Sequence, residues 1–284
     1  MHADELEFDD ELIRGLLAEQ FPQWANLPLE RVRFEGTDNA IFRLGEEMAV
    51  RLPRTAEGGD GPARENDTLA RLGPHLPLAT PRPIALGRPG AGYPCAWAIH
   101  SWVPGETAEG EIPVAGPALA ELLMALQAVD TAGAPPASRG VPLTSSEAFV
   151  ERLLGCRGLF DVDAALELWK EAVAARPWHR PPVWLHSDLD PRNLVLTEDA
   201  RVTGVLDFGG AGIGDPAFDF AAAYKVLPAD ERDAFRAALD VDDATWLRGR
   251  GWIVQQCTMA LPYYTLENNP ALVRGASRWI AEVL

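Results

Sequence analysis

The residues best suited to chemistry in this chain of 284 residues form a short polar run followed by a further acid. The run begins at His186 and contains Asp188 and Asn193, and Asp207 comes later in the chain. Carboxylate and amide oxygens suit Mg²⁺, which takes one or two protein carboxylates together with water and substrate phosphates. A carboxylate that is not bound to the metal can accept a proton from an attacking hydroxyl. The set therefore indicates a magnesium site with a general base beside it.

Short apolar strands are expected to bring these residues together. Strands predicted at 183–188, 194–196 and 202–208 place both acidic segments where a strand ends. Because the chain runs from strand to loop, strand, turn and strand, it should bring Asp188, Asn193 and Asp207 to the same edge of these strands. Asp, Asn, Pro and Gly also dominate ordinary turns, so each residue taken singly favours a turn interpretation. The whole set at this spacing favours a functional site.

The remaining predicted elements divide the chain into a strand-rich part and a helical part. We place the boundary beside Val103, which gives lobes at 1–102 and 103–284. Closely connected strands in the first lobe predict an antiparallel meander, and apolar residues at helical spacing dominate the second lobe. The predicted elements outside the site are a helix at 9–21, strands at 31–35, 40–44 and 48–52, a helix at 63–72, a strand at 95–103, helices at 119–129 and 162–173, and mostly helix from 216 onward.

Composition restricts the class of protein. The chain carries 25 Lys and Arg against 42 Asp and Glu, a formal charge of −17, which argues against a nucleic-acid binder. Three separated cysteines without a CxxC pair argue against a disulfide framework and indicate a reducing compartment. The acidic N-terminus does not resemble a signal peptide, and the most apolar stretch contains Pro, Gly and Glu. We expect a cytoplasmic protein, monomeric or weakly homodimeric, that binds neither nucleic acid nor membrane.

The polar run resembles a known catalytic signature. His-x-Asp-x-x-x-x-Asn followed by Asp-Phe-Gly occurs in protein-kinase-like folds, and here it spans 186–193 and 207–209. Together with Gly-Asp-Pro-Ala-Phe-Asp at 214–219, the pattern resembles the aminoglycoside phosphotransferase family of small-molecule kinases. The resemblance implies an α+β fold of two lobes. A small antiparallel-sheet N-lobe would bind nucleotide, and a larger, mostly helical C-lobe would carry catalysis and bind the acceptor.

The resemblance also implies roles for individual residues. The implied cofactors are Mg²⁺ and ATP or GTP as phosphoryl donor. Asp188 corresponds to the base that deprotonates the acceptor hydroxyl, and Asn193 and Asp207 correspond to Mg²⁺ ligands. The positions that correspond to nucleotide-binding residues of the family are Arg51, its helix partner Glu65, and Thr37 and Asn39 in the loop over the nucleotide.

Three departures from the family pattern stand out. Arg51 replaces the usual Lys, which keeps the charge but offers a planar fork in place of a compact ammonium. Ser187 replaces the Gly that commonly separates His from Asp. Position 190 is Asp, where protein kinases have Lys two residues after the base, which argues against a protein substrate.

The implied activity is transfer of the nucleotide γ-phosphate to a hydroxyl of a small molecule, with an aminoglycoside or macrolide-type antibiotic expected first. A kinase of an ordinary metabolite (sugar, choline or homoserine type) and a pseudokinase without transfer activity, motivated by Arg51, remain open. Asp188 and Asp190 also match the DxD motif of nucleotide-sugar glycosyltransferases, a pattern common by chance. Candidate acceptor neighbours, which equally fit helix caps and core positions, are Asp240, Asp242, Asp243, Tyr263, Tyr264 and Glu267.

Overall fold

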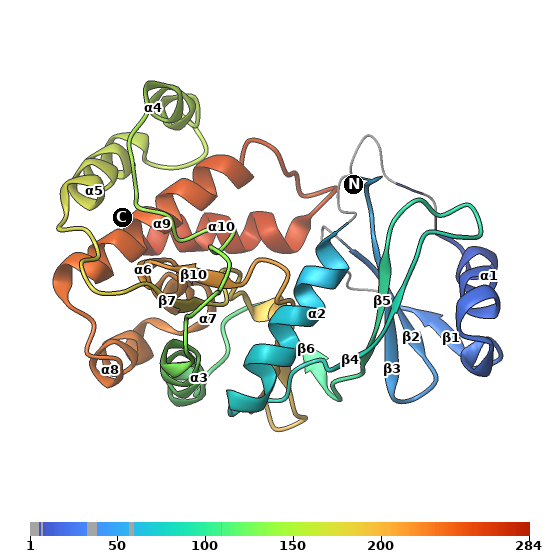
Figure 1. Cartoon of the computed structure of the whole chain (residues 1–284). Coiled ribbons are helices and arrows are strands. Elements are labelled where there is room, and N and C mark those ends of the chain that lie inside the picture. Colours follow the sequence, from blue (N-terminus) through green and yellow to red (C-terminus); the bar gives the residue numbers. More distant parts are fainter. Residues whose placement is uncertain (1–5, 7, 33–38, 57–59, 109) are drawn as a thin grey trace. The chain divides into compact units, whose positions relative to one another are not determined.

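The computed structural model describes residues 6, 8–32, 39–56, 60–108 and 110–284. They form two compact units, one built on a sheet and one mostly helical, which confirms the expected α+β class (Figure 1). The first unit comprises Met1–Pro104 and Gly204–Gly209, and the second comprises Gly105–Thr203 and Gly210–Leu284. Residues 204–209 belong to the first unit because they bond within it; Val205 N–H, for example, donates to the carbonyl of Ala79 at 2.9 Å.

The sheet of the first unit is antiparallel throughout, with strand order β1-β2-β3-β5-β4. The expected meander is present. The tight turn between its second and third strands contains Gly45 at φ +61°, a backbone region that glycine enters without steric cost. The strand expected at 31–35 is observed earlier in the chain, and 33–35 lie outside the described residues. The strands are β1 (Leu29–Arg31), β2 (Asn39–Leu44), β3 (Met48–Pro53), β4 (Pro83–Gly87) and β5 (Trp97–Ser101).

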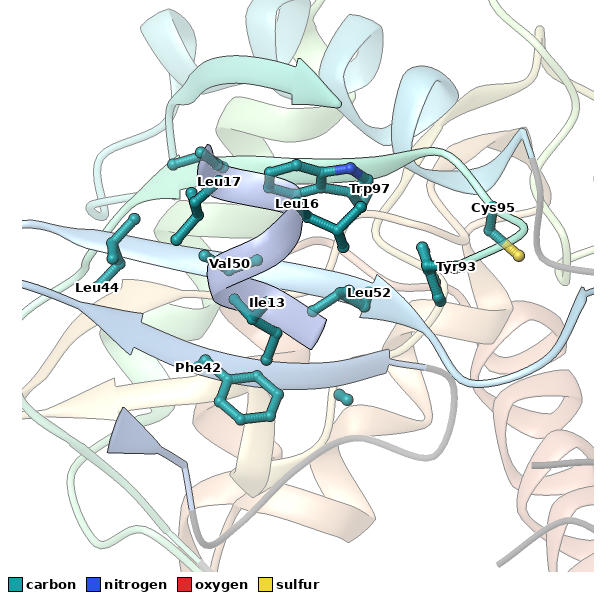
Figure 2. Close-up of a cluster of buried hydrophobic side chains, with 12 residues drawn as sticks. Ile13, Leu16, Leu17, Phe42, Leu44, Val50, Leu52, Tyr93, Cys95 and Trp97 are labelled. Atoms are coloured by element: carbon teal, nitrogen blue, oxygen red, sulfur yellow. The ribbon is translucent and has the colours of Figure 1, made fainter. Parts of the chain in front are cut away.

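Helix α1 (Asp10–Gln20) covers one face of this sheet. Asp9 caps the helix by accepting a hydrogen bond from the Leu12 N–H at 2.7 Å. Apolar residues at helical spacing on α1 point to the sheet. They pack against every second residue of the strands, because side chains alternate between the two faces of a sheet (Figure 2). The fully buried side chains of this core include Ile13, Leu16, Leu17, Phe42, Leu44, Val50, Leu52, Trp97 and Ile99.

Helix α2 (Gly61–Leu72) is the second helix of the first unit, close to its predicted bounds. Pro62 suits the first turn of the helix, because an N–H group there would have no acceptor within the helix and because the φ of proline is already helical. Leu69 and Leu72 are buried as expected. The same helix also buries a carboxylate, Glu65, at 5% exposure, and this charged residue requires a partner inside the unit.

The second unit is built mainly from helices, and α9 packs against both α5 and α10. Side-chain caps begin several of them, including Asp242 on α9, whose carboxylate accepts from Thr245 N–H at 2.8 Å. The helices are α3 (Gly116–Ala128), α4 (Glu147–Leu154), α5 (Val162–Ala174), α6 (Ala217–Phe220), α7 (Ala222–Val226), α8 (Arg232–Ala238), α9 (Asp243–Ala260) and α10 (Pro270–Val283).

Short strands connect these helices and carry the polar run. β7 (Val183–Leu185) pairs antiparallel with β10 (Gly212–Gly214), and β8 (Leu194–Leu196) lies between β6 (Glu106–Thr107) and β9 (Val202–Val205). The strands expected at 183–188 and 202–208 are therefore shorter than predicted. Both end before a residue with positive φ, Ser187 at +65° and Asp207 at +64°, and this conformation cannot continue a strand.

No helix within the described ranges is both long and apolar enough to cross a membrane. All three cysteines, Cys95, Cys156 and Cys257, are buried free thiols, in agreement with the absence of a disulfide framework expected from their spacing.

We predict that Gly251→Ala destabilises the second unit. Gly251 lies in α9 where a Cβ would come within 2.5 Å of the Ala172 Cβ in α5, so the added methyl group must push the helices apart. The free energy of unfolding should fall by about 1–3 kcal/mol in urea titrations followed by circular dichroism. Gly61→Ala, whose Cβ would meet nothing within 4 Å, is the control and should cost nothing. Equal stability of wild type and Gly251→Ala would contradict this packing.

Candidate active site

A buried carboxylate holds the start of the catalytic loop, residues 186–193, in the second unit. Asp219 in α6 is 1% exposed and accepts the backbone N–H groups of His186 at 2.7 Å and Ser187 at 2.9 Å. Burial raises the pKa of Asp219, and the hydrogen bonds from the two backbone N–H groups act against that rise. A carboxylate that spans two consecutive amides fixes the peptide that leads into Asp188.

The strained residue Ser187 is held by its own side chain. Its hydroxyl donates to the carbonyl of Gly210 at 2.6 Å and lies 3.3 Å from the hydroxyl of Ser138. These contacts and the Asp219 bond account for a non-glycine residue at φ +65°. Ser187, which departs from the family pattern, therefore adds a tie between the catalytic loop and the segment that follows Gly209.

His186 is fully buried, and its ring contacts the backbone of the same loop. Its Nδ1 lies 3.3 Å from the backbone N–H of Asp188, in position to accept a hydrogen bond. In this geometry the His186 ring supports the backbone of the loop at Asp188.

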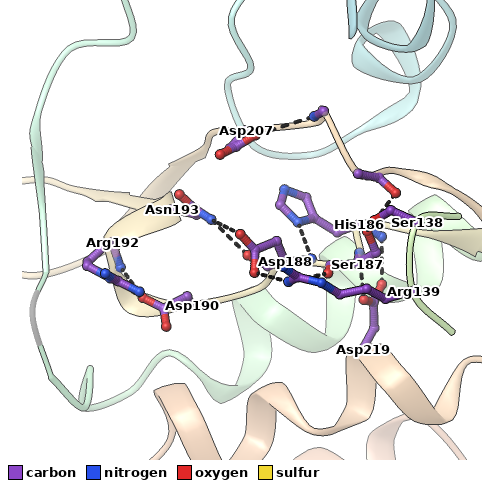
Figure 3. Close-up of polar contacts among 12 residues, drawn as sticks. Ser138, Arg139, His186, Ser187, Asp188, Asp190, Arg192, Asn193, Asp207 and Asp219 are labelled. Carbon is purple, nitrogen blue, oxygen red and sulfur yellow. Dashed lines mark hydrogen bonds and ion pairs between the residues drawn. The ribbon is translucent and has the colours of Figure 1, made fainter. Parts of the chain in front are cut away.

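Asp188 is bound from both sides (Figure 3). Its Oδ1 accepts from Arg139 at 2.8 Å, and Asn193 Nδ2 donates to the Asp188 carbonyl at 2.8 Å and lies 3.4 Å from Oδ2. Burial would raise the pKa of Asp188, but nearby positive charges, chiefly those of Arg139 and Lys225, outweigh it and leave this pKa below its usual value. The carboxylate is therefore ionised at neutral pH and able to accept a proton.

Sequence reasoning missed Arg139. It lies in the loop between α3 and α4, which carries no recognisable motif. The half-exposed guanidinium contacts the catalytic loop twice, at Asp188 Oδ1 and at 3.4 Å from the Ser187 carbonyl. No local sequence signal marks such a residue, because the contact joins positions 49 apart in the chain.

Asn193 is arranged to offer an oxygen. It closes the turn η4 (Pro191–Asn193), and since its amide nitrogen is committed to Asp188, its amide oxygen faces away from that residue (Figure 3). Among the residues that the structure describes, no three His, Cys, Asp or Glu side chains come together as a metal-binding group. An amide oxygen and a single carboxylate suit Mg²⁺, which completes its shell with phosphate and water oxygens.

The first unit gathers three of the predicted residues. Arg51 on β3 forms an ion pair with Glu65 of α2 at 3.1 Å and lies 3.7 Å from Asp207, which follows β9. Glu65 also accepts the backbone N–H of Phe208 at 3.2 Å. Burial raises the pKa of Glu65, opposed by the charge of Arg51. Arg51 and Glu65 are buried, whereas the side chain of Asp207 remains 30% exposed and can reach a ligand.

Among the remaining predicted residues, the structure describes Asn39 and the candidate acceptor neighbours. Asn39 begins β2 and pairs in register with Pro53, two residues beyond Arg51. Thr37 lies outside the described residues. Of the candidate acceptor neighbours, Asp242 caps α9 and Asp243 pairs with Arg236, so both have structural partners.

A buried ion pair anchors the segment 214–219 to α9. Asp215 and Arg248 form two hydrogen bonds, at 2.8 and 3.0 Å, and both side chains are nearly inaccessible. The segment therefore works as a support: Asp215 fixes it to α9, and Asp219 holds the catalytic loop.

The fold and these two clusters define a phosphotransferase of the protein-kinase-like type. A family model described as "Phosphotransferase enzyme family" (APH) matches residues 30–252. The chain is 31% identical over 211 residues to an aminoglycoside 3'-phosphotransferase of Streptomyces fradiae, covering 69% of this chain and 75% of the relative. The chain belongs to this phosphotransferase family.

Solved structures share the fold over nearly the whole chain. The GDP complex of wild-type aminoglycoside 2'-phosphotransferase-IIIa has a TM-score of 0.69 at 19% identity, covering 97% of this chain and 96% of that one. The macrolide 2'-phosphotransferase MphH from Brachybacterium faecium has a TM-score of 0.63 at 21% identity, covering 95% of this chain and 96% of that one. The expected bilobal kinase-like fold is confirmed.

We predict that Arg139→Met raises the pKa of Asp188. The Arg139 guanidinium stabilises the ionised carboxylate of Asp188, whereas burial destabilises it. Without the guanidinium the effect of burial is larger, and Asp188 should titrate at higher pH. Carbon NMR of labelled aspartate carboxyl groups measures this directly. Arg157→Met, which removes an exposed arginine paired with Asp163, is the control and should leave Asp188 unchanged. An unmoved Asp188 titration in Arg139→Met would exclude the electrostatic role.

Proposed function

We propose that this protein transfers the γ-phosphoryl group of ATP or GTP to a hydroxyl group of a small molecule. The observation that carries the proposal is the Asp188 carboxylate, kept ionised and oriented between Arg139 and Asn193. An ionised carboxylate in fixed orientation is what a general base for a hydroxyl requires. Membership of the phosphotransferase family supports the same reaction.

In the proposed reaction Asp188 orients the acceptor hydroxyl and takes its proton. The hydroxyl oxygen forms a bond to the γ-phosphorus while the bond from that phosphorus to the bridging oxygen of the β-phosphate breaks, and the nucleoside diphosphate leaves. Catalysis of phosphoryl transfer depends mainly on such positioning and on charge stabilisation. Asp219 contributes by holding the peptide before Asp188 in place.

The remaining site residues are proposed to hold nucleotide and metal. Asn193 and Asp207 would bind Mg²⁺, which when bound neutralises phosphate charge. Arg51, positioned by Glu65, would contact the nucleotide phosphates. Thr37, and Asn39 at the start of β2, are proposed to cover these phosphates. A fold neighbour solved with GDP supports a nucleotide donor and leaves GTP beside ATP as a candidate.

Two classes of acceptor are proposed. The names of the relatives favour an aminoglycoside or macrolide antibiotic, and with it a role in resistance. A compact metabolite is the second candidate, favoured by the cavity beside the catalytic loop that is described below. We further propose a cytoplasmic protein, monomeric or weakly dimeric, with a small-molecule acceptor and a nucleoside triphosphate as its ligands.

We predict that Asp188→Asn abolishes transfer without abolishing nucleotide binding. Removing the base should lower turnover about 10²- to 10⁴-fold, measured as nucleotide consumption with Mg²⁺ across aminoglycoside, macrolide and metabolite acceptors. Affinity for a fluorescent nucleotide should stay within about twofold of wild type, because this side chain is not assigned to the nucleotide. Asp163→Asn, at an exposed ion pair, is the control.

Three outcomes separate the candidate functions. Unchanged turnover in Asp188→Asn would exclude this residue as the base. A wild-type protein that binds nucleotide and transfers to no acceptor would be a pseudokinase. Affinity for a nucleotide sugar with Mn²⁺, without phosphorylation, would favour a glycosyltransferase.

A further inference from the structure

A cavity of about 190 Å³ lies in the second unit beside the catalytic loop. Residues from Asp190 to Arg192 form one wall, and α10 forms another. Pockets for drug-sized ligands measure about 300–1,000 Å³, so this space suits a more compact molecule. One lining residue, Asp190, follows the proposed base Asp188 by two positions in the same loop.

The charged lining of this cavity is mainly cationic. Among the described lining residues, one is an acid, Asp190, and three are arginines, Arg192, Arg274 and Arg278. Asp190 is buried and already accepts hydrogen bonds from the backbone N–H of Arg192 at 3.1 Å and its Nε at 2.8 Å. A polycationic acceptor would therefore find arginines and no unengaged carboxylate on these walls.

The arginine lining is held in place by other groups. Arg278 donates to the carbonyl of Lys225 at 2.8 Å and pairs with Glu111 and Glu282. These pairs orient the guanidinium and neutralise part of its charge. Lys225, whose carbonyl accepts the hydrogen bond from Arg278, does not itself line the cavity; its link to the lining is through Arg278 and Trp279.

Lys225 is a buried cation without a bonded partner among the described residues. It is 3% exposed, and within the described part of the chain its ammonium has neither a hydrogen-bond acceptor nor a carboxylate within ion-pair distance. The ammonium lies 5.5 Å from the centre of the Trp279 ring, and Trp279 lines the cavity. Burial lowers the pKa of Lys225, and the negative charges of Asp188 and Asp190 oppose that shift only in part. Leaving a buried charge without a hydrogen-bonded partner is costly, and an anion at this place would remove that cost.

The choice of residue points the same way. Of the 25 cationic residues in the chain, two are lysines, Lys170 and Lys225, and the rest are arginines. Lys170 is exposed on α5. A lysine ammonium is a compact point charge with three donors, which suits a carboxylate or phosphate oxygen in a small space.

We propose that the acceptor is a compact hydroxyl compound that carries an oxyanion, a carboxylate or a phosphate monoester, and that Lys225 binds this oxyanion beside Trp279. The assignment rests on the proposed function, because the hydroxyl of the same molecule must reach Asp188. Lys225 is then a specificity-determining residue that selects anionic acceptors over neutral and polycationic ones.

The first experiment uses the wild-type enzyme and matched acceptors. With Mg²⁺ and ATP or GTP, kcat/KM is compared for glycerate against glyceramide, for glycerol 3-phosphate against glycerol, and for kanamycin. Each anionic compound should exceed its neutral partner by at least about tenfold, the factor for one charge-assisted hydrogen bond. The two pairs distinguish a carboxylate from a phosphate. A neutral partner or kanamycin that is used equally well or better overturns the proposal.

The second experiment measures binding without turnover. Calorimetric affinities for propionate and propyl phosphate, which lack the hydroxyl, are compared among wild type, Lys225→Met and Lys170→Met. Lys225→Met should weaken binding about 10- to 100-fold, and Lys170→Met should not change it. Equal affinities for wild type and Lys225→Met overturn the proposal.

The two experiments separate this proposal from the proposed function. Anion binding that depends on Lys225, in a protein that phosphorylates nothing, would retain the site and reject the kinase. Phosphorylation of neutral acceptors without anion binding would do the reverse. Removing an unpaired buried charge should not lower stability, which a thermal melt of Lys225→Met checks, and Lys225→Gln provides a second variant that retains a polar group.

Discussion

The arrangement of the second unit's site depends on one buried carboxylate, Asp219. It accepts two consecutive backbone N–H groups, from His186 and Ser187, at the point where β7 ends. Because these amides point to the same acceptor, the peptide takes a left-handed conformation at Ser187 that the sheet could not produce. The position of Asp188, and through it of Arg139 and Asn193, follows from that turn. Asp219 is itself held in position because its segment is anchored by the ion pair between Asp215 and Arg248.

Local patterns were sufficient for most of the fold. Helices with capped starts and regular apolar spacing, such as α1 behind Asp9, were predicted within a few residues of their bounds. Strand ends near the site were placed too late, at 188 and 208, because positive φ at Ser187 and Asp207 results from tertiary contacts that no propensity scale contains. The site residues on motifs were found by their spacing, whereas Arg139 is attached to Asp188 only through the fold.

Charge is distributed unevenly in this acidic chain. The formal charge of −17 suggests a surface that attracts cations, yet the side chains that lower the pKa of Asp188 most are cationic, Arg139 and Lys225. Net charge therefore describes solubility and long-range attraction, whereas the ionisation of Asp188 depends on a few nearby side chains. Under the proposed function, the cations that keep Asp188 ionised would also repel a polycationic acceptor.

The first unit is discontinuous, since it takes residues 204–209 from a later part of the chain. Arg51 and Glu65 lie in its first segment, whereas Asp207 and the Phe208 amide that contact them lie in its second. An exchange of residues 1–104 between two relatives would replace half of this polar cluster and leave the other half from the original parent. Recombination at the apparent lobe boundary therefore divides a set of residues that has to change together, and a functional chimera requires a second crossover around 204–209.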